Sequence, residues 1–408
     1  MALRTIELFA GAGGLSMGGS LAGFAPVAVI EWNKWACDTV RENKERGYPL
    51  VTDWPIYEMD VREFDWDSVR ESIDVVTGGP PCQPFSLGGK HLGNDDNRDM
   101  FPAAVDVVRR LRPKAFIFEN VRGLTRATFA KYYQYILLQL ELPEIQRKPG
   151  ESWERHLWRL QSEKNSVKPH SSGLTYHVVP TLVDAANYGV PQRRERVFIV
   201  GYRSDLDIKW AFPQATHSFN ALLHSQWITG EYWERHGVAR RHRPSIPENL
   251  NSRIRELAES LFPLAERPWR TVRDALLGLP DPQDPESRRF RDHRFQSGAK
   301  TYPGHTGSPL DLPAKTLKAG DHGVPGGENM LIEDNGAVRY FTVRESARIQ
   351  TFPDGFVFHG SWTETMRQLG NAVPVTLGHL VAKNVAAALI ANEMERLSRE
   401  FTLEQGAA

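Results

Sequence analysis

The stretch from Gly78 to Ser86, with the sequence GGPPCQPFS, constrains this chain more than any other. It follows the β-branched run from Ile73 to Thr77, which is typical of a buried strand. Its prolines and glycines exclude a helix and a regular strand ladder, so we expect Cys82 on a rigid turn at the carboxyl end of that strand. Ligands of open α/β sheets bind at this edge. Most lone cysteines are packing thiols, but a cysteine held on such a turn is a candidate nucleophile.

Length and composition describe an ordinary globular protein that resides in the cytoplasm. The 408 residues exceed one typical domain and predict one large and one smaller domain. With only Cys37 and Cys82, a disulfide framework or a cysteine zinc site is excluded, which fits a reducing compartment. No signal segment or membrane-spanning stretch is expected. The formal net charge of zero does not indicate nucleic-acid binding, but a local basic face would be sufficient for it.

The amino-terminal segment has the pattern strand, glycine turn, helix, strand, over residues 3–9, 10–14, 15–24 and 27–30. This is nucleotide-binding architecture, in which glycines permit close approach and the helix start presents amide groups to a ligand. The dinucleotide fingerprint is not met, because Ser16 stands at its third glycine position, and no phosphate-binding P-loop is present. A tight turn that holds no ligand would show the same glycines.

Two acidic residues are expected at the same edge of the sheet. Glu31 ends the second strand twenty residues after Gly11, where an acid can bind the two hydroxyl groups of a ribose. Trp32 follows it and offers an apolar plate for an adenine ring, and Asp60 closes a further apparent strand. Two acids without a phosphate-binding lysine suit a ligand in which adenosine carries a positive charge. They do not suit a nucleoside triphosphate.

The chain after Cys82 continues the alternation of strands and helices. Residues 87–98 are expected to form a long mobile loop that closes over the site. A helix is predicted over 99–111, then a strand over 114–118 that leads into Glu119, poised for proton-linked work. Asn120 has the alternative role of capping the next helix. A helix over 132–142, an insertion over about 143–172 and a strand over 176–183 complete this part.

Arginines distinguish the rest of the chain. Three arginines between Gln192 and Arg196 enter the apolar strand 197–201, and arginine there needs an anionic or acceptor-rich partner. Residues 203–335 lose the α/β alternation, and we expect mostly short strands and loops with basic clusters. Helices are predicted from the segment 339–353, which stops at Pro353, and over 375–390.

Together these motifs resemble those of the bacterial DNA (cytosine-5)-methyltransferases, which use S-adenosylmethionine. The resemblance covers the chain apart from the insertion and residues 203–335, with the motifs in the family's usual order. It implies an α/β, Rossmann-like methyltransferase sheet with a second, smaller target-recognition domain of short strands and loops. The catalytic domain would comprise 1–202 and 336–408, and the target-recognition domain 203–335. The matching pieces are the segments 9–14, 80–83, 119–121, 192–196, 344–353 and 370–374, together with Glu31 and Asp60.

The resemblance also implies roles for individual residues. The thiolate of Cys82 would add to carbon 6 of a flipped-out cytosine, which makes carbon 5 nucleophilic. Glu119 would hold a proton at ring nitrogen 3, Arg196 would bind the 2-carbonyl, and Arg194 and Gln192 would orient this group. The residues implied around the methyl donor are Phe9, Gly11, Ala12, Gly13, Gly14, Glu31, Trp32, Asp60, Val61, Pro80, Asn371 and Ala372. The candidate DNA-binding residues are Gln83, Ser86, Lys90, His91, Arg98, Arg288, Arg289 and Lys315.

The expected partner is double-stranded DNA, read by a monomer that works alone or beside a separate restriction or phage-defence protein. No membrane and no metal are expected to take part. Three other readings stay open at this stage: methylation of transfer RNA cytosine, a nicotinamide or flavin enzyme, and a non-catalytic DNA-binding module. The long 203–335 region favours duplex DNA over RNA, and a binding module would not need Cys82, Glu119 and Arg196 together.

Overall fold

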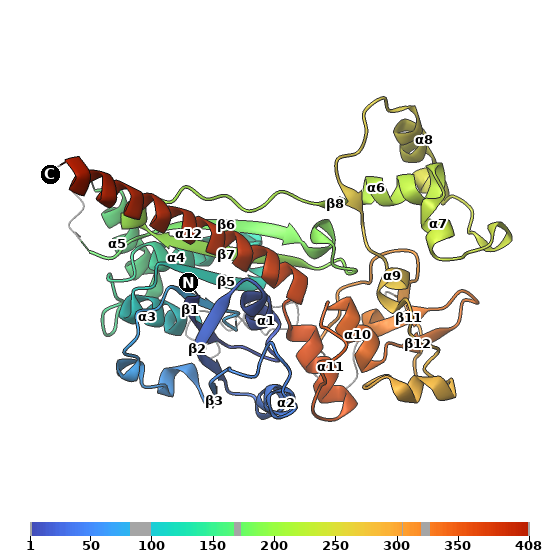
Figure 1. Cartoon of the computed structure of the whole chain (residues 1–408), viewed down its shortest axis with the longest axis horizontal. Helices are drawn as coiled ribbons and strands as arrows, with labels where there is room; N and C mark the ends of the chain where they lie inside the picture. Colours follow the sequence, from blue (N-terminus) through green and yellow to red (C-terminus); the bar gives the residue numbers. More distant parts are fainter. Residues whose placement is uncertain (1, 82–98, 167–172, 304, 320–326, 407–408) are drawn as a thin grey trace. The chain divides into compact units, whose positions relative to one another are not determined.

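The computed structural model describes residues 2–81, 99–166, 173–303, 305–319 and 327–406 (Figure 1). The chain divides into two compact units. Unit 1 comprises Met1–Val183, Glu195–Pro213 and Gly378–Ala408, and unit 2 comprises Asp184–Arg194 and Gln214–Leu377. Unit 2 is therefore longer than the predicted 203–335 region, because it also takes in 184–194 and 336–377.

Unit 1 is built on one mixed sheet in the strand order β3-β2-β1-β4-β5-β7-β6. The pairs β1–β2, β1–β4, β2–β3 and β4–β5 are parallel, and β5–β7 is antiparallel. Buried aliphatic and aromatic side chains of these strands form the core, as their apolar runs predict. The strands are β1 (Leu3–Leu8), β2 (Phe24–Glu31), β3 (Ile56–Glu58), β4 (Val75–Gly78), β5 (Ala115–Val121), β6 (Tyr176–Asp184) and β7 (Glu195–Arg203).

The direction of strand succession reverses between β1 and β4. From β1 the chain moves to β2 and β3 on one side, and from β4 it moves to β5 on the other. Such a topological switch point opens a crevice at the carboxyl ends of the strands, where α/β proteins bind their ligands. The helices of unit 1 are α1 (Gly14–Leu21), α2 (Lys34–Glu45), α3 (Phe101–Leu111), α4 (Ala130–Glu141), α5 (Trp153–Lys164) and most of α12 (Val375–Gly406).

Three details of unit 1 differ from the sequence expectation. The strand expected to end at Asp60 ends at Glu58, and Asp60 accepts a hydrogen bond from the backbone of Arg62 at the start of a 3-10 turn. The predicted insertion contains a helix, α5, which begins after the capping residue Ser152. Helix α12 continues to Gly406, well beyond the expected end near residue 390.

Helix α12 begins in close contact with α1. A Cβ atom at Gly18 would lie 2.4 Å from the backbone nitrogen of His379, so only glycine permits this approach. The stretch Trp362–Thr402 is long and apolar enough to cross a membrane by length and composition alone, which the sequence reading did not anticipate. In its most apolar window, 56% lies buried inside the protein, as in the core helix of a soluble protein.

Unit 2 combines very short strands with short helices. The strands match the expectation, whereas composition alone did not predict the helices α6 to α9. Two apolar clusters, one around Trp233 and one around Phe341, form its core. The strands are β8 (His217–Ser218), β9 (Arg267–Pro268), β10 (Ser308–Pro309), β11 (Met330–Ile332) and β12 (Val338–Tyr340), and the helices α6 (Phe219–Leu223), α7 (Glu231–Arg235), α8 (Asn251–Glu259), α9 (Val272–Leu276), α10 (Val343–Ile349) and α11 (Trp362–Asn371).

Candidate active site

Four strands of unit 1 bring their functional residues to one edge of the sheet. Leu8 at the end of β1 and Phe118 of β5 are both in register with Gly78 at the end of β4. The glycine turn after β1 and the turn of Gly79 to Pro81 after β4 therefore leave the sheet side by side. Glu119 lies one residue further along β5, and the antiparallel β7 begins at this edge with Arg196 opposite Val121.

Glu119 and Arg196 form an ion pair at this edge. The Nε atom of Arg196 lies 2.7 Å from Oε1 of Glu119, and the two side chains are only 11% and 9% exposed. Burial lowers the pKa of Arg196, which the nearby carboxylate opposes, and an arginine stays charged in proteins even so. A Cβ atom at Gly79 would lie 3.4 Å from Oε2 of Glu119, so this glycine keeps the space beside the carboxyl group open.

Two hydrogen bonds fix the turn that follows β4. The side-chain amide of Asn120 donates to the carbonyl oxygen of Pro80 over 2.8 Å, and the backbone of Met100 donates to that of Pro81 over 3.1 Å. Asn120 thus acts on the turn and does not cap a helix, since Val121 precedes the next 3-10 turn. Residues 82–98 lie outside the described residues, and with them the predicted nucleophile and the candidate DNA contacts Cys82, Gln83, Ser86, Lys90, His91 and Arg98.

Cys37, the other cysteine of the chain, is a packing thiol. It lies buried in α2, and its sulfur donates a hydrogen bond to the backbone oxygen of Glu31 over 3.4 Å. Burial is the main cause that raises its pKa to about 12, so a thiolate hardly forms near neutral pH. A cysteine nucleophile in this protein must therefore be Cys82.

The glycine turn after β1 has the backbone conformation of a ligand-binding loop. Phe9 and Gly11 both have φ of 55° and Gly13 has φ of 87°, all in the left-handed region. A non-glycine residue such as Phe9 is rare there, and such strained residues cluster at functional sites. A Cβ atom at Gly13 would lie 2.7 Å from the ring of Trp54. The sequence reading missed Trp54, because no spacing rule connects it with the turn.

Glu31 is held in place beside this turn. The backbone nitrogens of Gly11 and Asn33 each donate a hydrogen bond of 2.8 Å to one of its carboxylate oxygens. Burial raises the pKa of Glu31, and these backbone hydrogen bonds oppose the shift. Each oxygen keeps a second lone pair, so the carboxylate can also accept hydrogen bonds from the hydroxyl groups of a ligand.

The other predicted donor residues of unit 1 differ in their exposure and contacts. Trp32 is 73% exposed, and its role as a plate for an adenine ring stays a prediction. The carboxylate of Asp60 accepts two hydrogen bonds, of 3.0 and 2.6 Å, from the guanidinium of Arg62, which lowers its pKa. Ala12 and Val61 are buried, whereas Gly14 begins α1.

Four further predicted residues, Gln192, Arg194, Asn371 and Ala372, belong to unit 2, and the first two form hydrogen bonds with other residues of this unit. Gln192 is buried and bonded to the side chain of Gln350 (3.1 Å) and the backbone nitrogen of Leu317 (2.9 Å). Arg194 donates to the carbonyl oxygens of Leu317 and Gly370. Asn371 and Ala372 follow at the end of α11. Their roles toward the substrates stay predictions, and Gln350 is a partner that the sequence reading did not single out.

Of the candidate base-reading residues of unit 2, Arg288 and Arg289 are exposed and Lys315 is half-buried. Arg288 and Arg289 stand on the 3-10 turn Pro285–Arg289, and Arg289 lies 3.9 Å from Glu286 in a fully solvated ion pair. The ammonium group of Lys315 donates to the hydroxyl of Thr306 over 2.8 Å. Contacts of this kind at the surface are weak, so Arg289 and Lys315 can exchange them for contacts with DNA.

Comparisons with known proteins show the family of this chain. A model of the family described as C-5 cytosine-specific DNA methylase matches residues 3–142 and 160–387 and skips part of the predicted insertion. The Type II methyltransferase M.PspPI of Psychrobacter sp. (strain TA137) is 30% identical over 390 residues, which cover 93% of this chain and 78% of the relative. The Type II methyltransferase M.NgoMIV of Neisseria gonorrhoeae is 28% identical over 398 residues, or 95% and 99% of the two chains.

Solved structures share the fold. A protein encoded within an E. coli prophage superimposes with a TM-score of 0.56 at 20% identity, and the S. pombe Dnmt2 methyltransferase with 0.53 at 17% identity. Each comparison covers 95% of this chain and 99% of the other. Fold and site thus define a Rossmann-like, S-adenosylmethionine-dependent methyltransferase. The chain belongs to the C-5 cytosine-specific DNA methylase family and is a DNA (cytosine-5)-methyltransferase.

Proposed function

We propose that this enzyme methylates carbon 5 of a flipped-out cytosine in a specific duplex DNA sequence, through a covalent adduct with Cys82. The observation that carries the proposal is the buried pair of Glu119 and Arg196 beside the turn that leads to Cys82. Carbon 5 is too electron-poor to attack a methyl group unaided. A thiolate that adds to carbon 6 turns the ring into an enamine-like nucleophile.

The ion pair is suited to assist this addition. Ring nitrogen 3 and the 2-carbonyl are adjacent on cytosine, and the Glu119 and Arg196 head groups lie 2.7 Å apart. Glu119 would hold a proton at nitrogen 3, and Arg196 would donate to the carbonyl oxygen as negative charge develops there. Because both groups are largely removed from water, each interaction is stronger than on the surface. Carbon 5 would then take the methyl group. Loss of the proton from carbon 5 would release the Cys82 thiolate from carbon 6.

The residues at the ends of β1 and β2 would hold the methyl donor. Glu31 would accept hydrogen bonds from the ribose hydroxyls, Trp32 would stack on the adenine ring, and Asp60 would accept from its amine group. When bound, S-adenosylmethionine supplies a methyl group activated by its positive sulfonium. Phe9, Gly11 and Gly13 support this assignment through a strained turn that brings the backbone close to the ligand.

The biological setting belongs to the same proposal. Relatives named as Type II methyltransferases favour a role in restriction-modification or phage defence, beside a separate restriction protein. The enzyme would act as a monomer in the cytoplasm. A base stacked in duplex DNA cannot reach a turn at the sheet edge, which is why we include base flipping.

The two cysteines provide a matched test. Cys82→Ser should abolish methyl transfer and leave DNA binding intact, because a hydroxyl group is a far poorer nucleophile than a thiolate. Cys37→Ala removes a buried thiol that takes no part in the reaction, and should keep turnover. On DNA with 5-fluorocytosine at the target, wild type and Cys37→Ala should form a denaturant-resistant adduct. Turnover by Cys82→Ser would exclude the covalent route, and faster methylation of transfer RNA than of DNA would change the substrate.

A further inference from the structure

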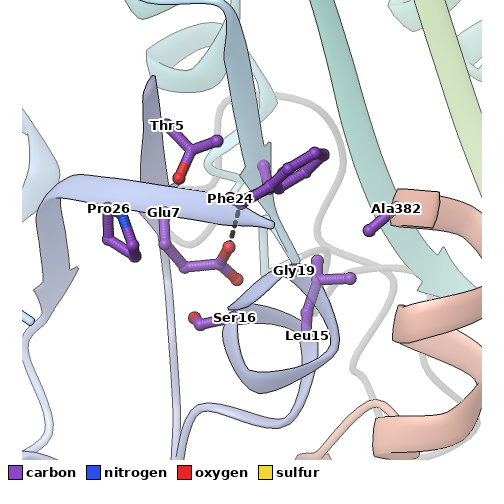
Figure 2. A pocket seen from close by; sticks show the side chains of 9 residues that line it. Thr5, Glu7, Leu15, Ser16, Gly19, Phe24, Pro26 and Ala382 are labelled. Carbon is purple, nitrogen blue, oxygen red and sulfur yellow. Dashed lines mark hydrogen bonds between the residues drawn. The ribbon is translucent and has the colours of Figure 1, made fainter. Parts of the chain in front are cut away.

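Glu7 is a buried acid that the proposed reaction does not use. It is the penultimate residue of β1, and only 3% of the residue is exposed. The hydroxyl of Thr77, on the neighbouring strand β4, donates a hydrogen bond to its carboxyl group, which the dashed line in Figure 2 marks. Among the residues that the structure describes, no cation pairs with Glu7, and a buried acid without such a partner is costly, so its presence needs a reason.

Glu7 and Ser16 face a small cavity inside unit 1. Figure 2 shows both side chains among those that line it, with Ser16 on the first turn of α1. The cavity measures about 10 Å³ and is lined by Thr5, Glu7, Ser16 and Thr77 among apolar side chains. This is about the space that one water molecule requires, and a buried water needs two to four polar partners. Four polar side chains are available here.

The hydroxyl of Ser16 points to an occupant of this cavity. It is buried, and within the described part of the chain it has no hydrogen-bond partner. Ser16 lies close enough to Glu7 to lower the pKa of its carboxyl group as a hydrogen-bonding neighbour would, although the geometry of the two side chains gives no direct hydrogen bond between them. A single water molecule between them would satisfy the serine hydroxyl and the second carboxyl oxygen together.

The carboxyl group of Glu7 is neutral under ordinary conditions. Burial raises its pKa to about 8, against the smaller opposing effects of Thr77 and Ser16. The other residues that line the cavity come from β1, α1, β2, β4 and α12, and none of them is titratable. A neutral carboxyl group can both donate and accept, so it can bond Thr77 and the water at once.

These contacts join the three elements that build the donor side of the site. Glu7 belongs to β1, which ends in the glycine turn, and Thr77 to β4, which ends in the Gly79 to Pro81 turn. Ser16 lies two residues after Gly14, where the glycine turn becomes α1. We propose that Glu7, Ser16, Thr77 and one enclosed water molecule hold these elements together, so that Glu7 is a positioning residue for the methyl donor. The inference rests on the proposed donor site.

The test compares Glu7→Gln, a neutral group of the same shape, with Glu7→Ala and Ser16→Ala. Calorimetry should show that Glu7→Gln binds S-adenosylhomocysteine as wild type does at pH 7, while Glu7→Ala and Ser16→Ala bind it about tenfold or more weakly. A crystal structure should show one water molecule between Glu7 and Ser16. Wild-type affinity in folded Glu7→Ala, or a dry cavity, would overturn the proposal.

Thermal unfolding provides a readout that is independent of the donor. Because the pKa of Glu7 is raised in the folded state, its contribution to stability is complete below the unfolded pKa and is lost as pH rises through about 8. Wild type should therefore lose melting temperature between about pH 5 and pH 8, where the folded state still holds the proton that the unfolded state has released, and Glu7→Gln should lose less. Equal losses would refute the role of Glu7. If wild type and Glu7→Gln differ in this pH dependence but wild type binds no donor, the role of Glu7 in stability stands. The proposed function would then be refuted.

Discussion

The side-chain amide of Asn120 donates a hydrogen bond of 2.8 Å to the carbonyl oxygen of Pro80, across the boundary between two parallel strands. Its own carbonyl oxygen accepts from the backbone of Val121, so the amide cannot turn over without losing both bonds. Pro80 stands two residues before Cys82, whereas Glu119 precedes Asn120 directly. One side chain therefore sets the distance between the turn of the nucleophile and the strand of the acid.

The first prediction concerns this link. Asn120→Asp keeps the acceptor for Val121 but cannot donate to Pro80, and Asn120→Ala loses both bonds. We expect turnover to fall about 100-fold in both, because a displacement of 1 Å in a reacting group costs that much. Stability should fall by about 1–3 kcal/mol, the cost of an unsatisfied buried polar group. Steady-state kinetics at full donor occupancy, beside urea unfolding, separates the two effects. Unchanged turnover would remove Asn120 from the site.

The second prediction concerns the buried ion pair. Arg196→Ala leaves the carboxylate of Glu119 unpaired in a largely dehydrated place, which should cost about 3–5 kcal/mol of stability. The double variant Glu119→Gln with Arg196→Met removes both charges and should recover most of that stability. Neither variant should methylate DNA. Urea unfolding and methyl transfer are the two measurements, and an active double variant would show that the pair is only structural.

Much of the site follows from sequence because strand ends are easy to place. The apolar run before Glu119 predicts β5 and puts the acid at its end, and the glycine turn after β1 is placed in the same way. What could not be predicted is which partner each side chain takes. Arg194 and Arg196 are two residues apart in one motif, yet one bonds carbonyl groups of Leu317 and Gly370 and the other bonds Glu119. No local rule separates them, because the partners are distant in sequence.

The third prediction uses two glycines with nearly the same backbone conformation. Gly13 has φ of 87° and Gly23 has φ of 88°, but a Cβ atom would lie 2.7 Å from Trp54 at Gly13 and meet open space at Gly23. Gly23→Ala should cost about 1–2 kcal/mol, for the left-handed backbone alone. Gly13→Ala should cost about 1–3 kcal/mol more, because the Trp54 ring must move. It should also weaken donor binding. Denaturant unfolding measures the loss of stability in both variants. Equal losses would mean that the Trp54 ring moves aside without cost.

The fourth prediction concerns the two acids of the donor pocket. Glu31→Ala and Asp60→Ala should each weaken donor binding by about 1–3 kcal/mol. Because burial raises the pKa of Glu31, its carboxylate takes up a proton at a higher pH than an exposed glutamate does. The pKa of Asp60 is lowered by Arg62, so Asp60 stays charged over the same range. Donor affinity should therefore fall on acidification in wild type and in Asp60→Ala, but not in Glu31→Gln. Calorimetry at several pH values measures this. If neither Glu31→Ala nor Asp60→Ala changes donor affinity, the donor pocket is wrongly assigned.

The last prediction is that unit 2 reads the DNA sequence. We propose that the residues of the sheet edge in unit 1 serve the donor and the cytosine, whereas Arg288 and Arg289 are exposed and Lys315 is half-buried. Alanine variants should fall into two kinds. Loss of a phosphate contact weakens binding to every sequence and flattens its salt dependence, whereas loss of a base contact costs about 1–3 kcal/mol at one position and relaxes it. Bisulfite sequencing of randomised DNA after reaction with each variant distinguishes them.

A graft into a relative of different specificity tests the whole assignment. The predicted reader spans 203–335, but residues up to Pro213 belong to unit 1, where Phe212 lies 5.8 Å from the ring of Phe198. The exchange should therefore begin at Gln214. It should end at residue 335, so that two hydrogen bonds stay within the recipient. These bonds join Gln192 to Gln350 and Arg194 to Gly370. Gln192 and Arg194, outside the exchanged segment, also bond Leu317 inside it. These bonds use the backbone nitrogen and oxygen of Leu317, so they do not depend on its side chain. An active graft should methylate the motif of this protein, and one that keeps the motif of the recipient would place sequence reading elsewhere.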